Sequence, residues 1–136
     1  MHRVGDEERD EGNLTRALTQ VFGDLDPGLL ETISTEFESI DVAGGSELFH
    51  QGDPGDSLYI LLRGRLNVCV ADPETGLETV LGEIAPGEAV GEIGLLTGET
   101  RSASLWATRD SRLVRIGQEA FDALAEKHTV LLRQLA

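Results

Sequence analysis

The sequence predicts a mainly β fold of about eight short strands, either a closed barrel or a jelly roll, with N-terminal helices and a C-terminal helix. Apolar residues repeat at helical spacing near both ends of the chain, whereas between residues 40 and 116 they alternate with polar ones. Turn sequences with glycine interrupt this alternating part about every 8 to 12 residues. The chain has 136 residues, of which 40% are hydrophobic, which is enough for the core of one domain.

The N-terminal part is expected to be helical only after a disordered acidic tail. Residues 1–13 are rich in charge and contain little to bury, so they predict the tail. Residues 14–39 predict a helical lead-in, in which Asp26 and Pro27 start a second helix as the N-cap and the first-turn residue.

The alternating part, residues 40–116, divides into about eight short strands. Gly64 is expected to let the chain reverse tightly between two of them, and residues 108–111 are expected to join the last two. Residues 117–136 predict the C-terminal helix, with Gly117 at its start. Residues 14–136 are therefore expected to form a single domain.

Composition excludes several classes of function. The net charge of −14 argues against a basic nucleic-acid interface and against docking on anionic membranes. Cys69 is the single cysteine and lies in an alternating apolar strand, so we expect a core residue and no internal disulfide. No run approaches the ~18 apolar residues of a membrane span, and the first residues lack the apolar core of a signal peptide. These features predict a cytoplasmic location.

The sequence predicts neither a metal site nor an enzyme. Its histidines are far apart, and none forms the His-x-His pair that a metal-binding β-barrel of the cupin type would use. No Ser-His-Asp or Cys-His set is apparent either. The three histidines are His2, His50 and His128.

Residues 89–106 contain the candidate ligand site. A glycine-rich segment that opens a short helix directs free backbone N–H groups at one point, which favours an anion. Arg101 can add a planar guanidinium that matches phosphate, and the small residues after it allow close approach. Glu92 only accepts hydrogen bonds, so it suits a sugar hydroxyl beside the phosphate. The alternatives are an Arg101 paired with a surface carboxylate and a Glu92 that merely stabilises a helix N-terminus.

These residues closely resemble the phosphate-binding cassette of the cyclic nucleotide-binding domain family. The cassette comprises Gly91-Glu92-Ile93-Gly94-Leu95-Leu96, followed by Arg101-Ser102-Ala103. A second signature of the family is similar to residues 52–61, a glycine and acidic turn that enters a strand, and to Gly64. The resemblance extends from residue 14 to the end of the chain, and it implies an eight-stranded β-roll, a jelly-roll-like barrel with flanking helices.

The resemblance implies the role of each cassette residue. Arg101 would hold the exocyclic phosphate oxygens, and Glu92 would accept a hydrogen bond from the ribose 2′-hydroxyl. The remaining residues would act mainly through the backbone, with a further donor in the Ser102 hydroxyl. They are Gly91, Ile93, Gly94, Ser102 and Ala103.

The function implied is that of a regulatory module, which binds cyclic AMP or cyclic GMP and needs no cofactor. Binding would shift Leu95 or Leu96 against Phe121 and Leu124 and so reposition the C-terminal helix, which could contact a second copy or a downstream effector domain. The alternative is a degenerate member that binds no nucleotide and serves as an interaction or structural domain. The cassette also resembles those of modules that precede patatin-like esterases in larger bacterial proteins.

Overall fold

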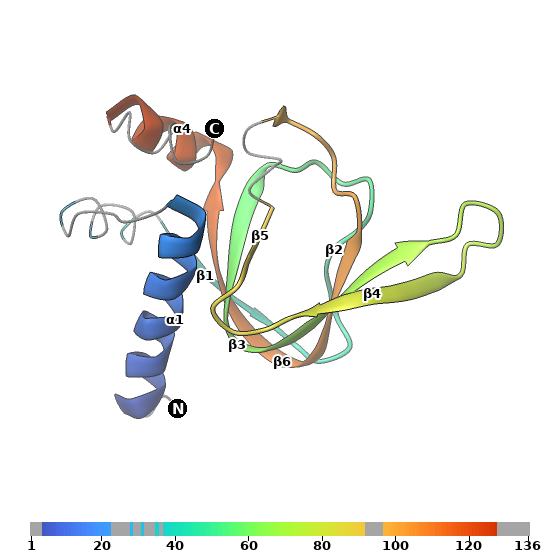
Figure 1. Ribbon diagram of the computed structural model, residues 1–136, viewed down its shortest axis with the longest axis horizontal. Helices are drawn as coiled ribbons and strands as arrows, with labels where there is room; N and C mark the ends of the chain where they lie inside the picture. Colours follow the sequence, from blue (N-terminus) through green and yellow to red (C-terminus); the bar gives the residue numbers. More distant parts are fainter. Residues whose placement is uncertain are drawn as a thin grey trace.

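The computed structural model of the chain describes residues 4–22, 28, 31, 35, 37–91 and 97–127. In the described part of the chain, two helices flank a six-stranded antiparallel sheet that curls into a roll (Figure 1). In chain order the elements are α1 (Val4–Phe22), β1 (Glu38–Val42), β2 (Glu47–Phe49), β3 (Ser57–Ala71), β4 (Glu78–Ile84), β5 (Ala89–Val90), β6 (Ser104–Gly117) and α4 (Gln118–Lys127).

Strands β3 and β6 are the centre of the sheet. The strand order is β1-β6-β3-β4, while β2 pairs with β6 and β5 pairs with β3. The sheet does not close, because β1 and β4 stand at opposite ends of this order. The prediction of a mainly β roll with flanking helices is confirmed.

The prediction of eight strands was wrong, since β3 and β6 each cover a segment that had been divided in two. Gly64 has a φ of +105°, yet it does not reverse the chain. The pairing of β3 with β6 instead shifts register around residues 61–66, so the strand bends and continues. Residues 108–111 likewise lie within β6 and form no turn between strands.

Helix α1 also differs from prediction. It begins at Val4, so the expected disordered tail was wrong for residues 4–13. The side-chain amide of Asn13 donates to the carbonyl of Leu62 at 2.9 Å, and Asp10 pairs with Arg63 at 3.1 Å. The charged N-terminal residues therefore belong to a helix, and contacts from Asp10 and Asn13 attach this helix to β3. The predicted second helix start at residues 26–27 and the end of the C-terminal helix, residues 128–136, lie outside the described residues.

Two apolar clusters hold the structure together because β3 is buried on both faces. One cluster lies between the sheet and the helices and includes Leu18, Ile60 and Phe121. The other fills the inside of the roll and includes Leu61, Leu66, Leu105, Ala107 and Leu113. Cys69 is buried, as predicted, and burial raises the pKa of its thiol.

Strand β4 forms a hairpin with β3 that projects away from the rest of the roll on the side opposite α1 (Figure 1). Its apolar residues Leu77, Val80 and Leu81 are 71%, 55% and 67% exposed. Val80 and Leu81 therefore do not pack in the core. Within the described segments, no helix combines the length and apolar character needed to cross a membrane.

Candidate functional site

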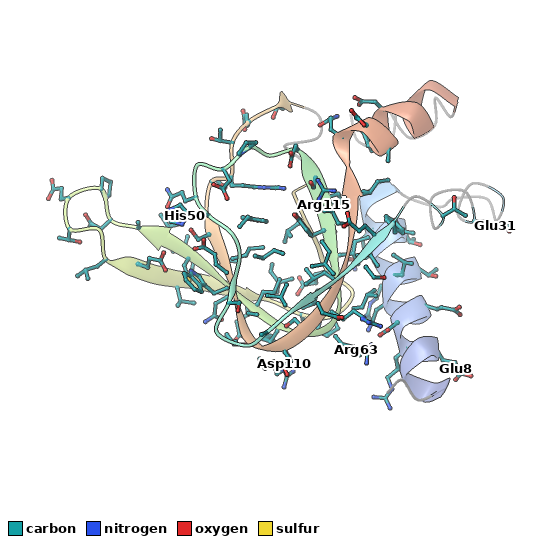
Figure 2. All side chains as sticks on the ribbon, turned by 180° about the vertical axis from the view of Figure 1, so that it is seen from behind. Glu8, Glu31, His50, Arg63, Asp110 and Arg115 are labelled. Carbon is teal, nitrogen blue, oxygen red and sulfur yellow. The ribbon has the colours of Figure 1, made fainter. Side chains whose placement is uncertain are left out.

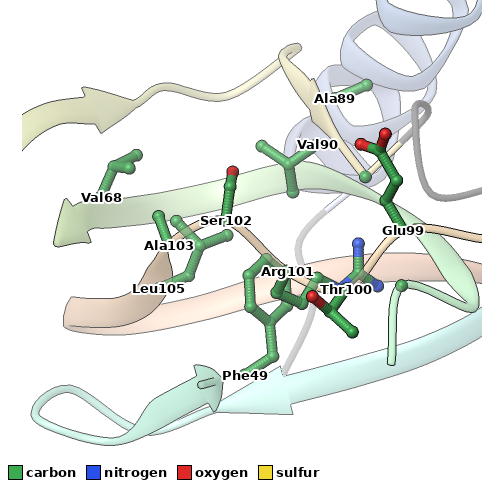
Figure 3. A pocket seen from close by; sticks show the side chains of 12 residues that line it. Phe49, Val68, Ala89, Val90, Glu99, Thr100, Arg101, Ser102, Ala103 and Leu105 are labelled. Carbon is green, nitrogen blue, oxygen red and sulfur yellow. The ribbon is translucent and has the colours of Figure 1, made fainter. Parts of the chain in front are cut away.

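A cavity of about 320 Å³ opens at the end of the roll interior (Figure 3). Its floor is continuous with the inner apolar cluster, since Phe49, Val68, Val90 and Leu105 belong to both. The segment 99–103 forms another wall. The remaining lining residues are Gly55, Ala89, Gly91, Glu99, Thr100, Arg101, Ser102 and Ala103.

Arg101 is the cationic side chain that lines this cavity, and the fold fixes it at both its backbone and its side chain. Its N–H donates to the carbonyl of Asp53, and its own carbonyl accepts from the N–H of Gly52, both at 2.8 Å. The guanidinium Nη2 donates to the carbonyl of Ser57 at 2.9 Å. The residue is only 7% exposed. Its head group therefore occupies one defined position.

Two aromatic rings accompany the guanidinium. The Cζ atom of Arg101 lies 4.3 Å from the centre of the Phe49 ring and 5.6 Å from that of Tyr59. The ring centres of Phe49 and Tyr59 are 5.9 Å apart. A cation over an aromatic face is attracted by the ring quadrupole. Figure 3 shows the Arg101 side chain beside the Phe49 ring, with Ser102 and Ala103 around the same cavity.

The charge of Arg101 has no anionic partner among the described residues. No carboxylate there lies within ion-pair distance, and its buried Nε has no hydrogen-bond partner. Burial lowers the pKa of the guanidinium, an effect that nearby Tyr59 and Asp56 oppose. An arginine nevertheless stays protonated at neutral pH. A buried cation without a counter-charge is costly, so the site favours an anion.

Gly91 makes room for this arrangement. Its φ is +96°, a conformation that side chains with a Cβ rarely adopt. A Cβ at this position would lie 2.5 Å from the carbonyl oxygen of Ser57 and would also collide with Nη1 of Arg101. Glycine is therefore required both by the backbone and by the guanidinium packed against it.

The structure brings four of the seven predicted site residues to the cavity. Gly91, Arg101, Ser102 and Ala103 all line it, with Ser102 exposed and Ala103 half-buried. Glu92, Ile93 and Gly94, like Leu95 and Leu96, lie outside the described residues. Pairing of Arg101 with a surface carboxylate, the alternative left open by the sequence, does not occur among the described residues.

Several site residues were missed from the sequence. Phe49, Tyr59 and the carbonyl of Ser57 position the guanidinium, and Glu99 places a carboxylate on the wall. The sequence around Phe49 and Tyr59 does not indicate a contact with Arg101, because strand alternation predicts only the face of the sheet on which a residue lies.

Comparison with known proteins places this geometry in one family. The family model described as the cyclic nucleotide-binding domain matches residues 40–128, more than half of the chain. A lysophospholipase nte1 from Emericella nidulans is 40% identical over 110 residues, and one from Aspergillus oryzae is 38% identical over 123 residues. The matches cover 81% and 90% of this chain but only 7% and 8% of those relatives. They agree with the expectation that the module resembles a part of a larger esterase-type protein.

Solved structures show the same fold. The regulatory domain of Toxoplasma gondii PKA, crystallised with cAMP, has a TM-score of 0.77 at 28% identity, covering 91% of this chain and 46% of that one. The catabolite activator protein of Thermus thermophilus has a TM-score of 0.76 at 30% identity, covering 85% and 54%. With the cassette arginine buried at the cavity and the family model matching most of the roll, the chain belongs to the cyclic nucleotide-binding domain family.

Proposed function

We propose that this module binds a 3′,5′-cyclic nucleotide, cyclic AMP or cyclic GMP, and acts as a regulatory sensor without catalytic activity of its own. The observation that carries the proposal is the buried guanidinium of Arg101, which has no carboxylate partner among the described residues and lines an open cavity. The cavity volume of about 320 Å³ lies within the range of about 300–1,000 Å³ that small-molecule sites occupy.

In this proposal the phosphate takes the place of the missing counter-charge. Arg101 binds the exocyclic oxygens, and the N–H groups of Ser102 and Ala103 donate beside it. Gly91, Ile93 and Gly94 contribute backbone on the other side of the phosphate. Glu92 accepts a hydrogen bond from the ribose 2′-hydroxyl, because a carboxylate is an acceptor only.

The structure supports a route from Arg101 to the C-terminal helix. Nη2 of Arg101 bonds to the carbonyl of Ser57, and the preceding carbonyl, that of Asp56, accepts from the N–H of Gln118 at 2.9 Å. Gln118 is the first residue of α4, and Ser57 pairs with Gly117 just before it. A phosphate that draws the guanidinium from Ser57 would therefore disturb the start of α4. We propose that α4 relays occupancy in this way to a second copy or an effector domain.

The relatives suggest what such an effector could be. The two lysophospholipases contain a region like this module in a polypeptide more than ten times as long. We propose that the module senses the cytoplasmic pool of a cyclic nucleotide and regulates an esterase domain of that kind.

Calorimetric titration with cyclic AMP and cyclic GMP, each beside its 2′-deoxy analogue, tests the proposal. We expect saturable binding of at least one nucleotide and at least about tenfold weaker binding of its 2′-deoxy form, since a site built for a hydroxyl leaves Glu92 unpaired without it. Flat traces from a folded protein would instead support the degenerate, ligand-free alternative.

The Phe49 ring gives a second, smaller test. Phe49→Leu keeps an apolar side chain but removes the aromatic face, so the affinity for the nucleotide should fall about 2- to 30-fold, corresponding to about 0.5–2 kcal/mol. Phe49→Tyr should retain most of the affinity, and Phe37→Leu, in the cluster beside the helices, should leave it unchanged. Equal affinities for Phe49→Leu and the wild type would show that the ring does not position Arg101.

A further inference from the structure

A second set of polar side chains meets near the loop end of the paired strands β3 and β4, outside the nucleotide cavity. Glu47 lies on β2, His50 follows that strand directly, and Glu78 opens β4. One potential ligand atom from each of the three lies within 4.8 Å of the other two. Figure 2 shows His50 beside the hairpin, where its side chain is 59% exposed to solvent.

We propose that Glu47, His50 and Glu78 form a binding site for a divalent transition-metal ion of the zinc type. An imidazole nitrogen and two carboxylates are ligands that Zn²⁺ accepts, and water can complete the coordination. Mg²⁺ and Ca²⁺ prefer oxygen ligands alone, so the histidine selects against them. The sequence did not predict this site, because Glu78 reaches His50 only through the pairing of distant strands and no His-x-His pair marks it.

Hydrogen bonds fix the backbone near His50 and near Glu78. The N–H of His50 donates to the carboxylate of Asp53 at 2.9 Å, and the N–H of Gln51 donates to the buried hydroxyl of Ser104 at 2.8 Å. The side-chain oxygen of Gln51 accepts from the N–H of Ala71 at 3.1 Å, and Ala71 is the strand partner of Glu78. Gln51 thus joins the turn after β2 to the end of β3 and to the start of β6. The backbone positions of His50 and Glu78 are thereby fixed relative to each other.

The contacts among these side chains are weak without an ion. Nδ1 of His50 lies 3.1 Å from Oε2 of Glu47 and 3.4 Å from the hydroxyl of Ser104. An exposed pair of this kind contributes little to stability. A metal ion would bind both carboxylates and the imidazole together, replacing a single proton on the ring.

Metal and proton therefore compete at His50. The hydrogen bond and charge of Glu47 raise the pKa of the imidazole, and the charges of Asp53 and Glu78 act in the same direction. The neutral ring is the form that binds a metal ion, so a proton and a metal ion exclude each other at the same nitrogen.

The site lies next to the backbone that fixes the nucleotide arginine. The turn that begins at His50 contributes both Gly52 and Asp53, which bond to the carbonyl and the N–H of Arg101. An ion that links this turn to β4 would restrict the movement of the turn, and so of the Arg101 backbone that is bonded to it. The metal site stands on its own geometry and does not depend on nucleotide binding.

Titration of the metal-free protein with ZnCl₂, followed by calorimetry and by the NMR signals of the His50 ring, tests the proposal. We expect one ion per chain, a shift of the ring signals, and an increase in Tm on saturation. His50→Gln and Glu78→Gln should each weaken binding at least about tenfold, because loss even of an outer-shell partner typically costs about 10- to 100-fold. Glu83→Gln, which removes an exposed carboxylate from the same strand, should bind as the wild type does.

Three results would overturn the site. They are no saturable binding of Zn²⁺, binding that survives both His50→Gln and Glu78→Gln, and equal binding of Mg²⁺ or Ca²⁺. Because His50 and Glu78 are exposed, we expect their variants to fold with nearly the stability of the wild type. Because no arm of the titration contains a nucleotide, its outcome is independent of the proposed sensor function.

Discussion

An Arg101→Ala variant is expected to bind cyclic AMP or cyclic GMP at least about 30-fold more weakly than the wild type, and up to several thousandfold. Removal of one member of a buried charge pair costs about 2–5 kcal/mol of binding, which corresponds to that range. The guanidinium supplies the cationic charge of the cavity wall, and among the described residues no other arginine or lysine lines it. Calorimetric titration of both proteins with the nucleotide measures the effect.

Arg109→Ala is the matched control, because it removes an exposed arginine from β6 and leaves the cavity intact. Its affinity should equal that of the wild type. Arg101→Lys should fall between the two, since an ammonium keeps the charge but loses the planar pair of donors. Full affinity in Arg101→Ala would remove Arg101 from the ligand site and with it the main support for the sensor function.

Gly64→Ala is expected to cause the largest loss of stability in the sheet. The φ of +105° strains any residue that carries a Cβ, at a cost of about 1–3 kcal/mol. The added Cβ would also lie 2.7 Å from both Cα and Cβ of Ser111. Ser111 cannot move aside, because its hydroxyl accepts from the N–H of Arg65 and donates to the carbonyl of Arg109. Overpacking of this kind adds about 1–3 kcal/mol.

Urea denaturation should therefore show a free energy of unfolding several kcal/mol lower than that of the wild type. Gly82→Ala provides the comparison, since this glycine lies on β4 with a φ outside the left-handed region and with no atom within 4 Å of a Cβ. Its unfolding free energy should stay within about 0.5 kcal/mol of the wild type. If the two alanine variants unfold at the same urea concentration, close packing at Gly64 is not required.

The candidate site was predictable where its residues are close in sequence and not where they meet across strands. Arg101, Ser102 and Ala103 follow one another, and their types suggest phosphate directly. Phe49 and Tyr59 reach Arg101 through pairing of strands far apart in the chain, so only the fold shows them at the guanidinium. That no carboxylate among the described residues pairs with Arg101 likewise depends on three-dimensional distances.

In β3 the strand count failed because glycine in a positive φ conformation has two uses. At Gly87 it belongs to a turn between β4 and β5, as the sequence suggests, whereas at Gly64 it permits a close approach between two long strands. Composition does not distinguish these two uses of glycine.

The high charge of the N-terminal residues led to the wrong prediction of a disordered tail. A helix with a short buried face around Ala17 and Leu18 can carry many acidic residues on its remaining surface.

The projecting β3–β4 hairpin has a practical consequence for colloidal behaviour. Strand β4 stands at the edge of the sheet with Leu77, Val80 and Leu81 open to water, a combination that favours edge-to-edge aggregation. At neutral pH the net charge of −14 keeps the molecules apart by mutual repulsion. That repulsion disappears near the isoelectric point of about 4.4, and high salt screens it. Acidic or salt-rich buffers should therefore precipitate the protein first through this hairpin, and Leu81→Lys should keep it in solution.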